Sequence, residues 1–221
     1  MNRLPSLLRQ HIAAFRMLLA FTVLTGIIYP VVMWGISQAA FKNQADGSLV
    51  TYNGKVVGSS LLCQEFVDAK GNPLPQYFQP RPSAASSSSI KTDYGCDPGF
   101  SGAASLGPNN PTLLTTVKQL QQQISAFDHV PVSQIPPDAV TSSGSGLDPD
   151  ISPQNADIQV NRVAKARGLS PAAVQALVTK NTQGRNIGIL GEPRVDVLTL
   201  NIALDELPGQ AAYVGGGAGQ G

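Results

Sequence analysis

The segment TSSGSGLDPDISP, residues 141–153, gathers the residue types that could do chemistry in this sequence. Glycines between serines let backbone N–H groups approach a phosphate. The candidate nucleotide-binding residues are therefore Ser143, Gly144, Ser145, Gly146 and Leu147. The strong phosphate-loop pattern, however, has a lysine after its last glycine and a helix directly behind it, and neither occurs here. This comparison favours a structural loop.

The carboxylates of the same segment suggest two further kinds of site. Asp148 and Asp150 could contribute to a cation site, but a calcium loop needs about six oxygen ligands and usually another carboxylate downstream. Asp148 and Asp150, or Asp205 and Glu206, could also act as paired general acids and bases. Nothing in the spacing of either pair indicates that chemistry, so we expect no metal site and no carboxylate catalysis.

The histidines and cysteines give no support to a nucleophilic mechanism or a zinc site. His11 precedes a long apolar run and His129 stands alone, whereas a hydrolase needs a nucleophile, a base and an orienting acid. Cys63 and Cys96 have no neighbouring histidine pair. We therefore predict that this chain has no catalytic residues and binds no cofactor of its own.

An apolar run near the N-terminus predicts how the chain is anchored. Residues 17–36, MLLAFTVLTGIIYPVVMWGI, carry no formal charge. A helix of about 20 residues reaches roughly 30 Å, the thickness of the hydrocarbon core of a bilayer. We predict a transmembrane helix over residues 13–36. The alternative is a signal peptide cleaved after Ser37-Gln38-Ala39, but its apolar core would normally be only about 7–15 residues long.

The charges beside this run predict its orientation. Arg3, Arg9 and Arg16 precede it, and the first 36 residues contain no acidic residue. The positive-inside rule then makes residues 1–12 a cytoplasmic tail and places the rest of the chain outside. Cys63 and Cys96 would face an oxidising compartment, where they either form a disulfide or remain unpaired, partly buried thiols. The net charge of +1 gives no reason to expect nucleic acid as a partner.

The residues after the span predict one extracytoplasmic α+β domain over residues 37–210, followed by a flexible tail or expression remnant over 211–221. Residues 48–60 hold two β-prone stretches around Asn53-Gly54, a dipeptide typical of hairpin turns. Residues 74–111 are rich in proline, glycine and serine and follow no period. Their aromatic residues indicate that parts of this segment pack against something; they are Tyr77, Phe78 and Phe100.

Three capped helices and a final β region are expected next. Each helix begins with a cap residue followed by proline, and the expected ranges are 111–127, 153–167 with its end at Gly168, and 171 to near Gly184. Residues 187–207, with apolar Val195, Val197 and Leu200, predict one or two strands. Residues 160–182 also resemble a DNA-binding helix-turn-helix, but an external segment meets no chromosomal DNA, so we interpret this pair as a packing unit.

Six segments, taken together and in order, resemble one known family. They are TGIIYP (25–30), YFQPRPSA (77–84), SLGPNNPTL (105–113), TSSGSGLDPDISP (141–153), QVNRVAKARGLS (159–170) and GEPRVDVLTLNIALD (191–205). They resemble the C subunits of the bacterial high-affinity potassium-transporting P-type ATPase, the Kdp complex. The resemblance extends from the apolar span to Asp205.

This resemblance implies an accessory subunit, needed for assembly and stabilisation of the pump and for tuning potassium access from outside. Its expected partners are a potassium-channel-like subunit, the catalytic P-type ATPase subunit, a small membrane peptide and the lipid bilayer. ATP, Mg²⁺ and K⁺ would be used by the complex through those other subunits, and the Asp-Lys-Thr-Gly phosphorylation motif is absent from this chain. The implied location is the bacterial inner membrane, crossed once.

The resemblance also bears on the candidate residues. One proposal for the family links the SGSGL stretch to nucleotide binding, but residues 143–147 could not reach cytoplasmic ATP from outside the membrane. We interpret them as a rigid turn. The alternative function is an independent extracytoplasmic ligand-binding or enzymatic domain, which would act without partners. The candidate partner contacts are Tyr29, Pro30, Trp34, Tyr77, Phe78 and Arg81.

Overall fold

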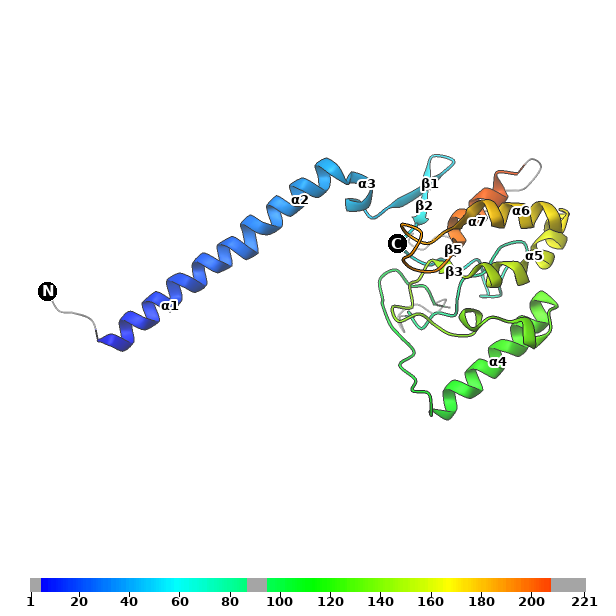
Figure 1. Ribbon diagram of the computed structural model, residues 1–221, viewed down its shortest axis with the longest axis horizontal. Coiled ribbons are helices and arrows are strands. Elements are labelled where there is room, and N and C mark those ends of the chain that lie inside the picture. Colours follow the sequence, from blue (N-terminus) through cyan, green and yellow to red (C-terminus); the bar gives the residue numbers. More distant parts are fainter. Residues whose placement is uncertain (1–4, 87–94, 208–221) are drawn as a thin grey trace. The chain divides into compact units, whose positions relative to one another are not determined.

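The computed structural model describes residues 5–86 and 95–207 (Figure 1). The predicted tail at 211–221 and the first four residues of the predicted cytoplasmic tail lie outside this range. The chain divides into two compact units, residues 1–48 and 49–221. The boundary falls after Ser48 rather than after residue 36, because the N-terminal helix continues to Ala40 and the short helix α3 (Lys42–Ala45) follows.

The N-terminal unit is one long apolar helix. It consists of α1 (Ser6–Val23), the π-helical turn η1 (Leu24–Ile28) and α2 (Tyr29–Ala40). Over Ser6–Ala40 its most apolar window has a mean hydropathy of 2.0, which makes it long and apolar enough to cross a membrane. The helix includes the predicted 13–36 but begins seven residues earlier than predicted, at Ser6.

The π-helical turn has a cause in the sequence. Pro30 lacks an N–H group, and its ring would crowd the carbonyl group of the preceding turn in a regular α-helix. Widening the turn at Leu24–Ile28 accommodates the ring without ending the helix. The Thr25 hydroxyl donates to the Phe21 carbonyl oxygen at 2.6 Å, which satisfies an acceptor beside the widened turn.

The second unit begins with the predicted hairpin. Strands β1 (Leu49–Tyr52) and β2 (Lys55–Ser59) pair antiparallel with Tyr52 opposite Lys55. Asn53 and Gly54 both have positive φ, 49° and 76°, as a two-residue hairpin turn requires. The prediction of a hairpin around Asn53-Gly54 is confirmed.

The capping residues begin three helices where the sequence predicts them. The helices are α4 (Pro111–Asp128), α5 (Pro153–Arg167) and α6 (Pro171–Asn181). The side chains of Asn110, Ser152 and Ser170 each accept a hydrogen bond from a backbone N–H of the first turn. Helix α5 ends at Gly168, as predicted, while α6 ends three residues before Gly184 because the chain there enters a strand.

A small antiparallel sheet adjoins these helices. Its order is β3 (Asp150–Ile151), β5 (Arg194–Asp196), β4 (Thr182–Gln183), so β5 is central. Figure 1 shows α5 and α7 (Val197–Asp205) beside β3 and β5. The two 3₁₀ turns η2 (Val132–Gln134) and η3 (Pro137–Ala139) connect α4 to this region.

The prediction of strands over 187–207 is correct only for Arg194–Asp196, because Val197–Asp205 is the helix α7. The Asp196 carboxylate accepts from the Thr199 N–H at 2.6 Å and begins this helix. Helix α7 is buried around most of its circumference, with Val197, Leu198, Leu200 and Leu204 all in the core. Such a helix has no polar face and therefore no 3.6-residue pattern in its sequence.

Side chains of α5 and α7 bind the backbone of residues 75–79, which belong to no helix or strand. Arg162 donates to the carbonyl oxygens of residues 75 and 77 at 2.7 and 2.8 Å, and Arg167 donates to that of residue 76 at 2.7 Å. Asn201 pairs with both backbone groups of residue 78, each at 2.9 Å. Gln159 does the same at residue 79, at 2.8 and 3.2 Å. This network supplies the hydrogen bonds that a sheet would otherwise provide.

Buried ion pairs hold the two arginines in place. Arg162 Nε donates to Asp128 Oδ1 at 2.6 Å, with side-chain exposures of 4% and 5%. Arg167 donates to Asp205 at 2.7 Å, and the Tyr77 hydroxyl donates to the same carboxylate at 3.0 Å. Burial raises the pKa of Asp128, while its pairing with Arg162 opposes that shift. Removing one partner would leave the other as a buried, uncompensated charge.

We predict that Arg162→Ala destabilises the folded chain by about 3–5 kcal/mol, because the buried Asp128 carboxylate loses its arginine partner and alanine offers no donor in its place. Arg185→Ala is the control, since the Arg185–Glu192 pair is 46% and 78% exposed and such pairs contribute less than about 1 kcal/mol. Urea unfolding of the detergent-solubilised full chain measures both. Equal losses for the two variants would contradict a stabilising role for the buried network.

Candidate functional site

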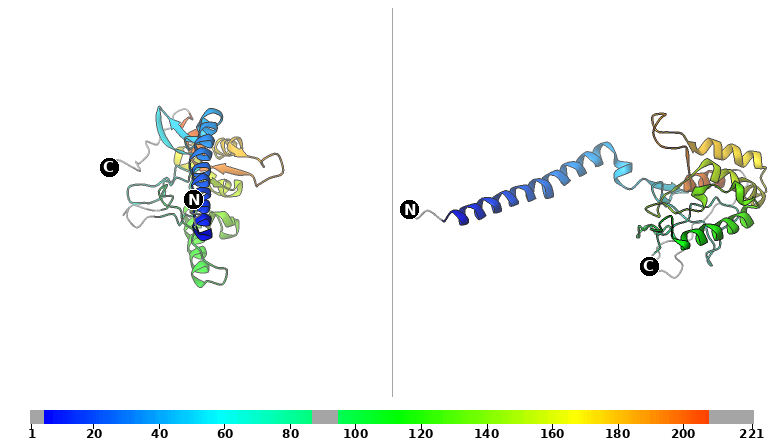
Figure 2. Two further views of the ribbon diagram at one scale, coloured as in Figure 1. Left: turned by 90° about the vertical axis from the view of Figure 1, so that its left-hand side faces the viewer. Right: turned by 60° about the horizontal axis from the view of Figure 1, so that its bottom comes forward.

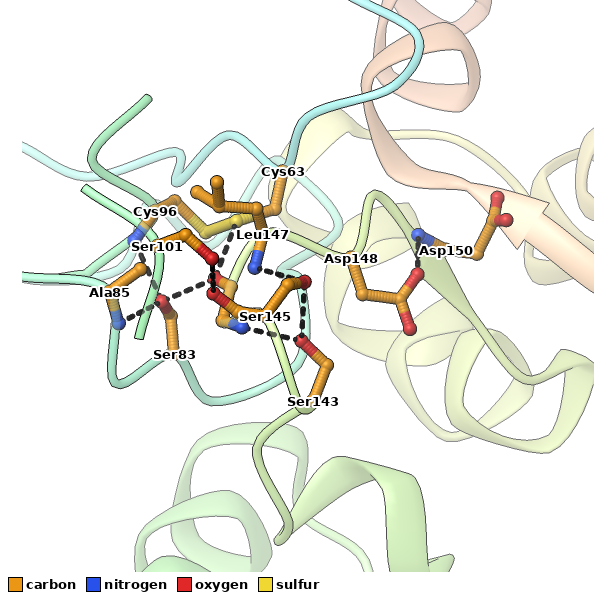
Figure 3. The surroundings of a disulfide bond; sticks show 11 residues. Cys63, Ser83, Ala85, Cys96, Ser101, Ser143, Ser145, Leu147, Asp148 and Asp150 are labelled. Carbon is orange, nitrogen blue, oxygen red and sulfur yellow. Dashed lines mark hydrogen bonds between the residues drawn. A yellow bond between two sulfur atoms is a disulfide. The ribbon is translucent and has the colours of Figure 1, made fainter. Parts of the chain in front are cut away.

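The SGSGL loop closes on itself. Ser143 Oγ accepts from the Gly146 N–H at 2.9 Å, and Ser145 Oγ accepts from the Leu147 N–H at 3.1 Å (Figure 3). The Asp148 carboxylate accepts from the Asp150 N–H at 3.0 Å. The backbone N–H groups of Gly146 and Leu147, which a phosphate would require, are thus bound by the loop's own serines.

The carbonyl groups of the loop bind the segments around it. The Ser145 oxygen accepts from the Gly102 N–H at 2.9 Å and from the Ser101 hydroxyl at 3.1 Å. The Gly146 oxygen accepts from the Ser83 hydroxyl at 2.6 Å, and the Leu147 oxygen accepts from the Cys63 N–H at 3.0 Å. The loop therefore joins three segments that are distant from it in the sequence.

A disulfide lies beside the loop. Cys63 and Cys96 are bonded, with their Cα atoms 5.4 Å apart and both residues buried. Of the two states that the sequence allowed, the structure thus has the disulfide. Ser83 Oγ accepts from the N–H groups of Cys96 and Ala85 at 2.9 and 3.0 Å (Figure 3). The bridge spans 33 residues, and closing a loop of that size stabilises a fold by about 4 kcal/mol on the chain-entropy model.

The two glycines of the loop have different roles. Gly146 has φ +71°, and a Cβ there would overlap the Gly102 carbonyl oxygen and lie 2.8 Å from Ala85 N. A Cβ added at Gly144 would meet no atom within 4 Å, and the φ of Gly144 is not positive. Only Gly146 is therefore required by the backbone angle and by the close approach of another segment.

Arg81 connects the two ends of the loop. Its Nη1 lies 2.9 Å from Asp148 Oδ2, and its Nη2 donates to the Thr141 carbonyl oxygen at 3.3 Å. The side chain stays 23% exposed, so this arginine braces the loop and also reaches the surface. Among the residues predicted to contact a partner, it is one that the structure leaves accessible.

The other predicted contacts divide into two groups. Tyr29 and Trp34 are exposed on α2, and Pro30 is beside them. Tyr77 and Phe78, in contrast, are 3% and 0% exposed, because the backbone network draws them into the core of the second unit. Their side chains pack within the chain instead of facing a partner. The expected packing of the third aromatic residue fails, since Phe100 is exposed.

Members of the two candidate carboxylate pairs, Asp148/Asp150 and Asp205/Glu206, bind arginines. Asp148 binds Arg81, and Asp150 binds Arg194 at 3.1 Å. Asp205 is bound by Arg167. These three carboxylates thus each have a structural cation of their own, which does not suit general acid–base work by a pair. Within residues 5–86 and 95–207, no group of three or more histidine, cysteine, aspartate or glutamate side chains could hold a metal ion.

A surface pocket of about 410 Å³ adjoins this region, lined by Asp150, Arg194, Asp196 and Thr199, among others. Burial raises the pKa of Asp196, and hydrogen bonds from the start of α7 oppose the shift. Burial and the neighbouring Asp196 charge also raise the pKa of Asp150, while Arg194 lowers it. The pocket is thus lined by the buried carboxyl of Asp196, which caps α7, and by the partly exposed carboxyl of Asp150, which pairs with Arg194.

Sequence reasoning missed most of the residues that hold the loop and the 75–79 segment. Ser83 and Ser101 lie in an aperiodic stretch, and Gln159 and Asn201 occur inside helices as single polar residues. A buried amide within an apolar helix is a usable signal, because burial requires it to find hydrogen-bond partners. The partners themselves come from distant segments, which no local pattern indicates.

These features define a class: a protein with one helix that could span a membrane and an α+β unit whose polar motifs brace its own backbone. Residues 11–206 match the model of the family described as KdpC, the K⁺-transporting ATPase c chain. The chain belongs to the KdpC family, as the six segments indicated.

Curated relatives agree with this membership. The chain is 49% identical over 192 residues to the potassium-transporting ATPase KdpC subunit of Sorangium cellulosum, covering 87% of this chain and 95% of the relative. It is 48% identical over 204 residues to the KdpC subunit of Paraburkholderia phytofirmans, covering 92% and 98%. The Streptomyces avermitilis KdpC subunit is 46% identical over 207 residues, covering 88% and 92%.

The two loop glycines generate a matched prediction. Gly146→Ala should destabilise the chain by about 2–5 kcal/mol, from the unfavourable backbone angle and the overlap with the 102 and 85 backbones. Gly144→Ala should change stability by less than about 0.5 kcal/mol, because its side chain enters open space. Thermal unfolding of the two full-length variants in detergent measures both. A similar loss at both positions would show that the loop does not depend on Gly146 geometry.

Asp196 generates a prediction on pH. The pKa of Asp196 is raised in the folded chain above the ordinary value of 3.8, which applies to the unfolded chain. The folded carboxyl therefore keeps its proton to a higher pH than the unfolded one. Stability is therefore lost as pH rises from that value through the raised folded pKa. Asp196→Asn keeps a capping oxygen but removes the buried charge. We expect the variant to be at least as stable as the unmodified chain at pH 7, with its advantage shrinking towards pH 4.

The exposed Asp68 is the control for that measurement. Hydrogen bonds from Asn72 hold its pKa below the ordinary value, so its contribution to stability is present at neutral pH and lost as pH falls through the lowered value. Asp68→Asn should therefore show the opposite sign, with a small loss at pH 7 that disappears in acid. An Asp196→Asn variant that is less stable than the unmodified chain at pH 7 would mean that the charge stabilises the helix more than burial penalises it.

Proposed function

We propose that this chain is a non-catalytic accessory subunit of an ATP-driven potassium uptake pump. It serves assembly and stabilisation of the complex and tunes potassium access from outside. Membership of the KdpC family supports a subunit role, and gives no support to the alternative of an independent ligand-binding or enzymatic domain. The observation that carries the proposal is the SGSGL loop, which is closed on itself and bound to three other segments.

The closed loop supports a structural role over a nucleotide site. A phosphate would have to displace the serine oxygens from the Gly146 and Leu147 N–H groups, and no lysine follows the glycines to offset that cost. In this proposal residues Ser143–Leu147 hold no ATP. ATP, Mg²⁺ and K⁺ are used by the complex through its other subunits.

The disulfide supports an extracytoplasmic position for the second unit. Disulfides persist in oxidising compartments and are rare in the cytosol, and Cys63–Cys96 is buried beside the loop. The arginines before the apolar helix favour a cytoplasmic N-terminus. We therefore place the chain in the bacterial inner membrane with a single span, and with residues after the span on the outer side.

The proposed partners are a potassium-channel-like subunit, the catalytic P-type ATPase subunit and a small membrane peptide, in a lipid bilayer. Tyr29, Pro30 and Trp34 are placed to contact a neighbouring transmembrane helix, because all three are exposed on α2, which follows the widened turn. Arg81 offers a partly exposed guanidinium on the second unit. The surface around the loop would brace the channel-like subunit.

The test is purification of the tagged full-length chain from its native membrane in mild detergent. We expect stoichiometric partner chains and potassium-stimulated ATPase activity in the eluate. Gly146→Ala should reduce both at least several-fold, and the matched Gly144→Ala should reduce neither, because only the first change distorts the loop. A chain that elutes alone and inactive from cells expressing the pump would contradict the subunit role. Loss of ATP affinity in Gly144→Ala would instead indicate a nucleotide role.

A further inference from the structure

The connection between β4 and β5, residues 184–193, forms a projecting loop that is closed by its own hydrogen bonds. Asn186 and Leu190 exchange both backbone hydrogen bonds, at 2.8 and 2.9 Å, so the tip is a closed turn. Arg185 and Glu192 form an ion pair of 2.7 Å below it. Figure 2 shows the loop, in orange, projecting from the body of the second unit. Since β5 is the central strand and leads directly into α7, the tip is tied to the core.

The tip exposes three large aliphatic side chains. Ile187 is 88% exposed, Ile189 74% and Leu190 57%. Single exposed aliphatic residues are ordinary, but three within four positions of one closed turn form a contiguous apolar surface. Nothing in the described parts of the chain covers them.

The backbone at the tip is strained. Ile187 has φ +56°, a left-handed conformation that a β-branched residue rarely adopts and that asparagine or glycine adopts readily. An isoleucine at this position therefore lowers the stability of the chain and gains no burial within it. Backbone strain of this kind clusters at functional sites, which points to a use for the Ile187 side chain outside its own fold.

The charge and shape of the tip indicate what covers it. Residues 186–191 carry no formal charge, and Arg185 and Glu192 neutralise each other. The tip also has no tryptophan or tyrosine, which peripheral membrane segments use at the interface together with cationic residues. A preorganised turn suits a binding partner of fixed shape, whereas a fluid bilayer imposes no such shape. An uncharged apolar pocket in a protein fits these features better than an anionic lipid surface.

We infer that the tip, Ile187, Ile189 and Leu190, docks into an apolar pocket on the extracytoplasmic surface of another subunit of the same complex. This inference rests on the proposed accessory role and adds the contact through which it is exerted. The three side chains act as buried anchors, and the neutral ion pair at the base lies at the rim. Through β5 the contact is joined directly to the helix that holds the 75–79 backbone.

The test uses the tagged full-length chain with the variant Ile187→Asn/Ile189→Ser. Asparagine tolerates the left-handed backbone, so the chain alone should unfold at the same or a higher temperature. Partner chains recovered with the variant should nevertheless fall by about tenfold or more, the scale expected from losing two buried aliphatic anchors. Opposite changes in stability and in partner recovery are a result that a merely structural loop would not give.

The control is Leu114→Ser, which removes an exposed aliphatic side chain from α4, away from the tip. It should leave partner recovery unchanged. If the unmodified chain recovers its partners and the tip variant recovers them equally well, the docking inference is wrong while the subunit role stands. If the unmodified chain recovers no partners, the proposed function itself fails.

A second measurement separates a protein pocket from lipid. The variant Ile189→Cys is labelled with an environment-sensitive fluorophore, which is selective because both cysteines in the described chain are in the disulfide. In nanodiscs, we expect a blue shift only when the other subunits are present. A blue shift in nanodiscs with this chain alone, unchanged by the other subunits, would mean that lipid covers the tip. No shift in either sample would also overturn the inference.

Discussion

The second unit depends on the recognition of an unpaired backbone segment by side chains. The backbone of residues 75–79 is hydrogen-bonded to the side chains of Arg162, Arg167, Asn201 and Gln159 instead of to a neighbouring strand. Because buried backbone groups without partners are costly, this arrangement lets an irregular segment cross the core without a neighbouring strand. The aromatic side chains at 77 and 78 belong to the same buried core as residues of α5 and α7.

The SGSGL loop applies the same principle at the surface. Its serine and aspartate side chains satisfy its amides, and its carbonyl groups hold segments that have no regular structure of their own. With the disulfide, the loop gives a fixed shape to a region poor in helices and strands. A glycine- and serine-rich motif can thus serve rigidity as well as ligand binding, and the hydrogen-bond partners of its N–H groups distinguish the two.

Local signals predicted the parts of the fold that local physics determines. The caps at Asn110, Ser152 and Ser170 and the Asn53-Gly54 turn are confirmed, since each is decided by a few neighbouring residues. Helix α7 was missed because burial around most of its circumference removes the periodicity by which a helix is predicted. The packing of Tyr77 and Phe78 was expected from their aromatic side chains, but their partners, such as Asn201 and Asp205, could not be named because they are far along the chain. The missing lysine favoured a structural role for the SGSGL loop over a nucleotide site. The residues that bind the loop, such as Ser83 and Ser101, could not be named from the sequence.

The distances along the chain between these partners have a consequence for the order of folding. The Phe78 N–H finds Asn201 across 123 positions, and the Tyr77 hydroxyl finds Asp205 across 128. Contacts between such remote residues form late, because a long loop must close before they are made. The second unit therefore cannot complete its core until translation has passed Asp205. A chain that ended before α7 would leave the 75–79 backbone without these partners, so synthesis of α7 is a condition for a stable second unit.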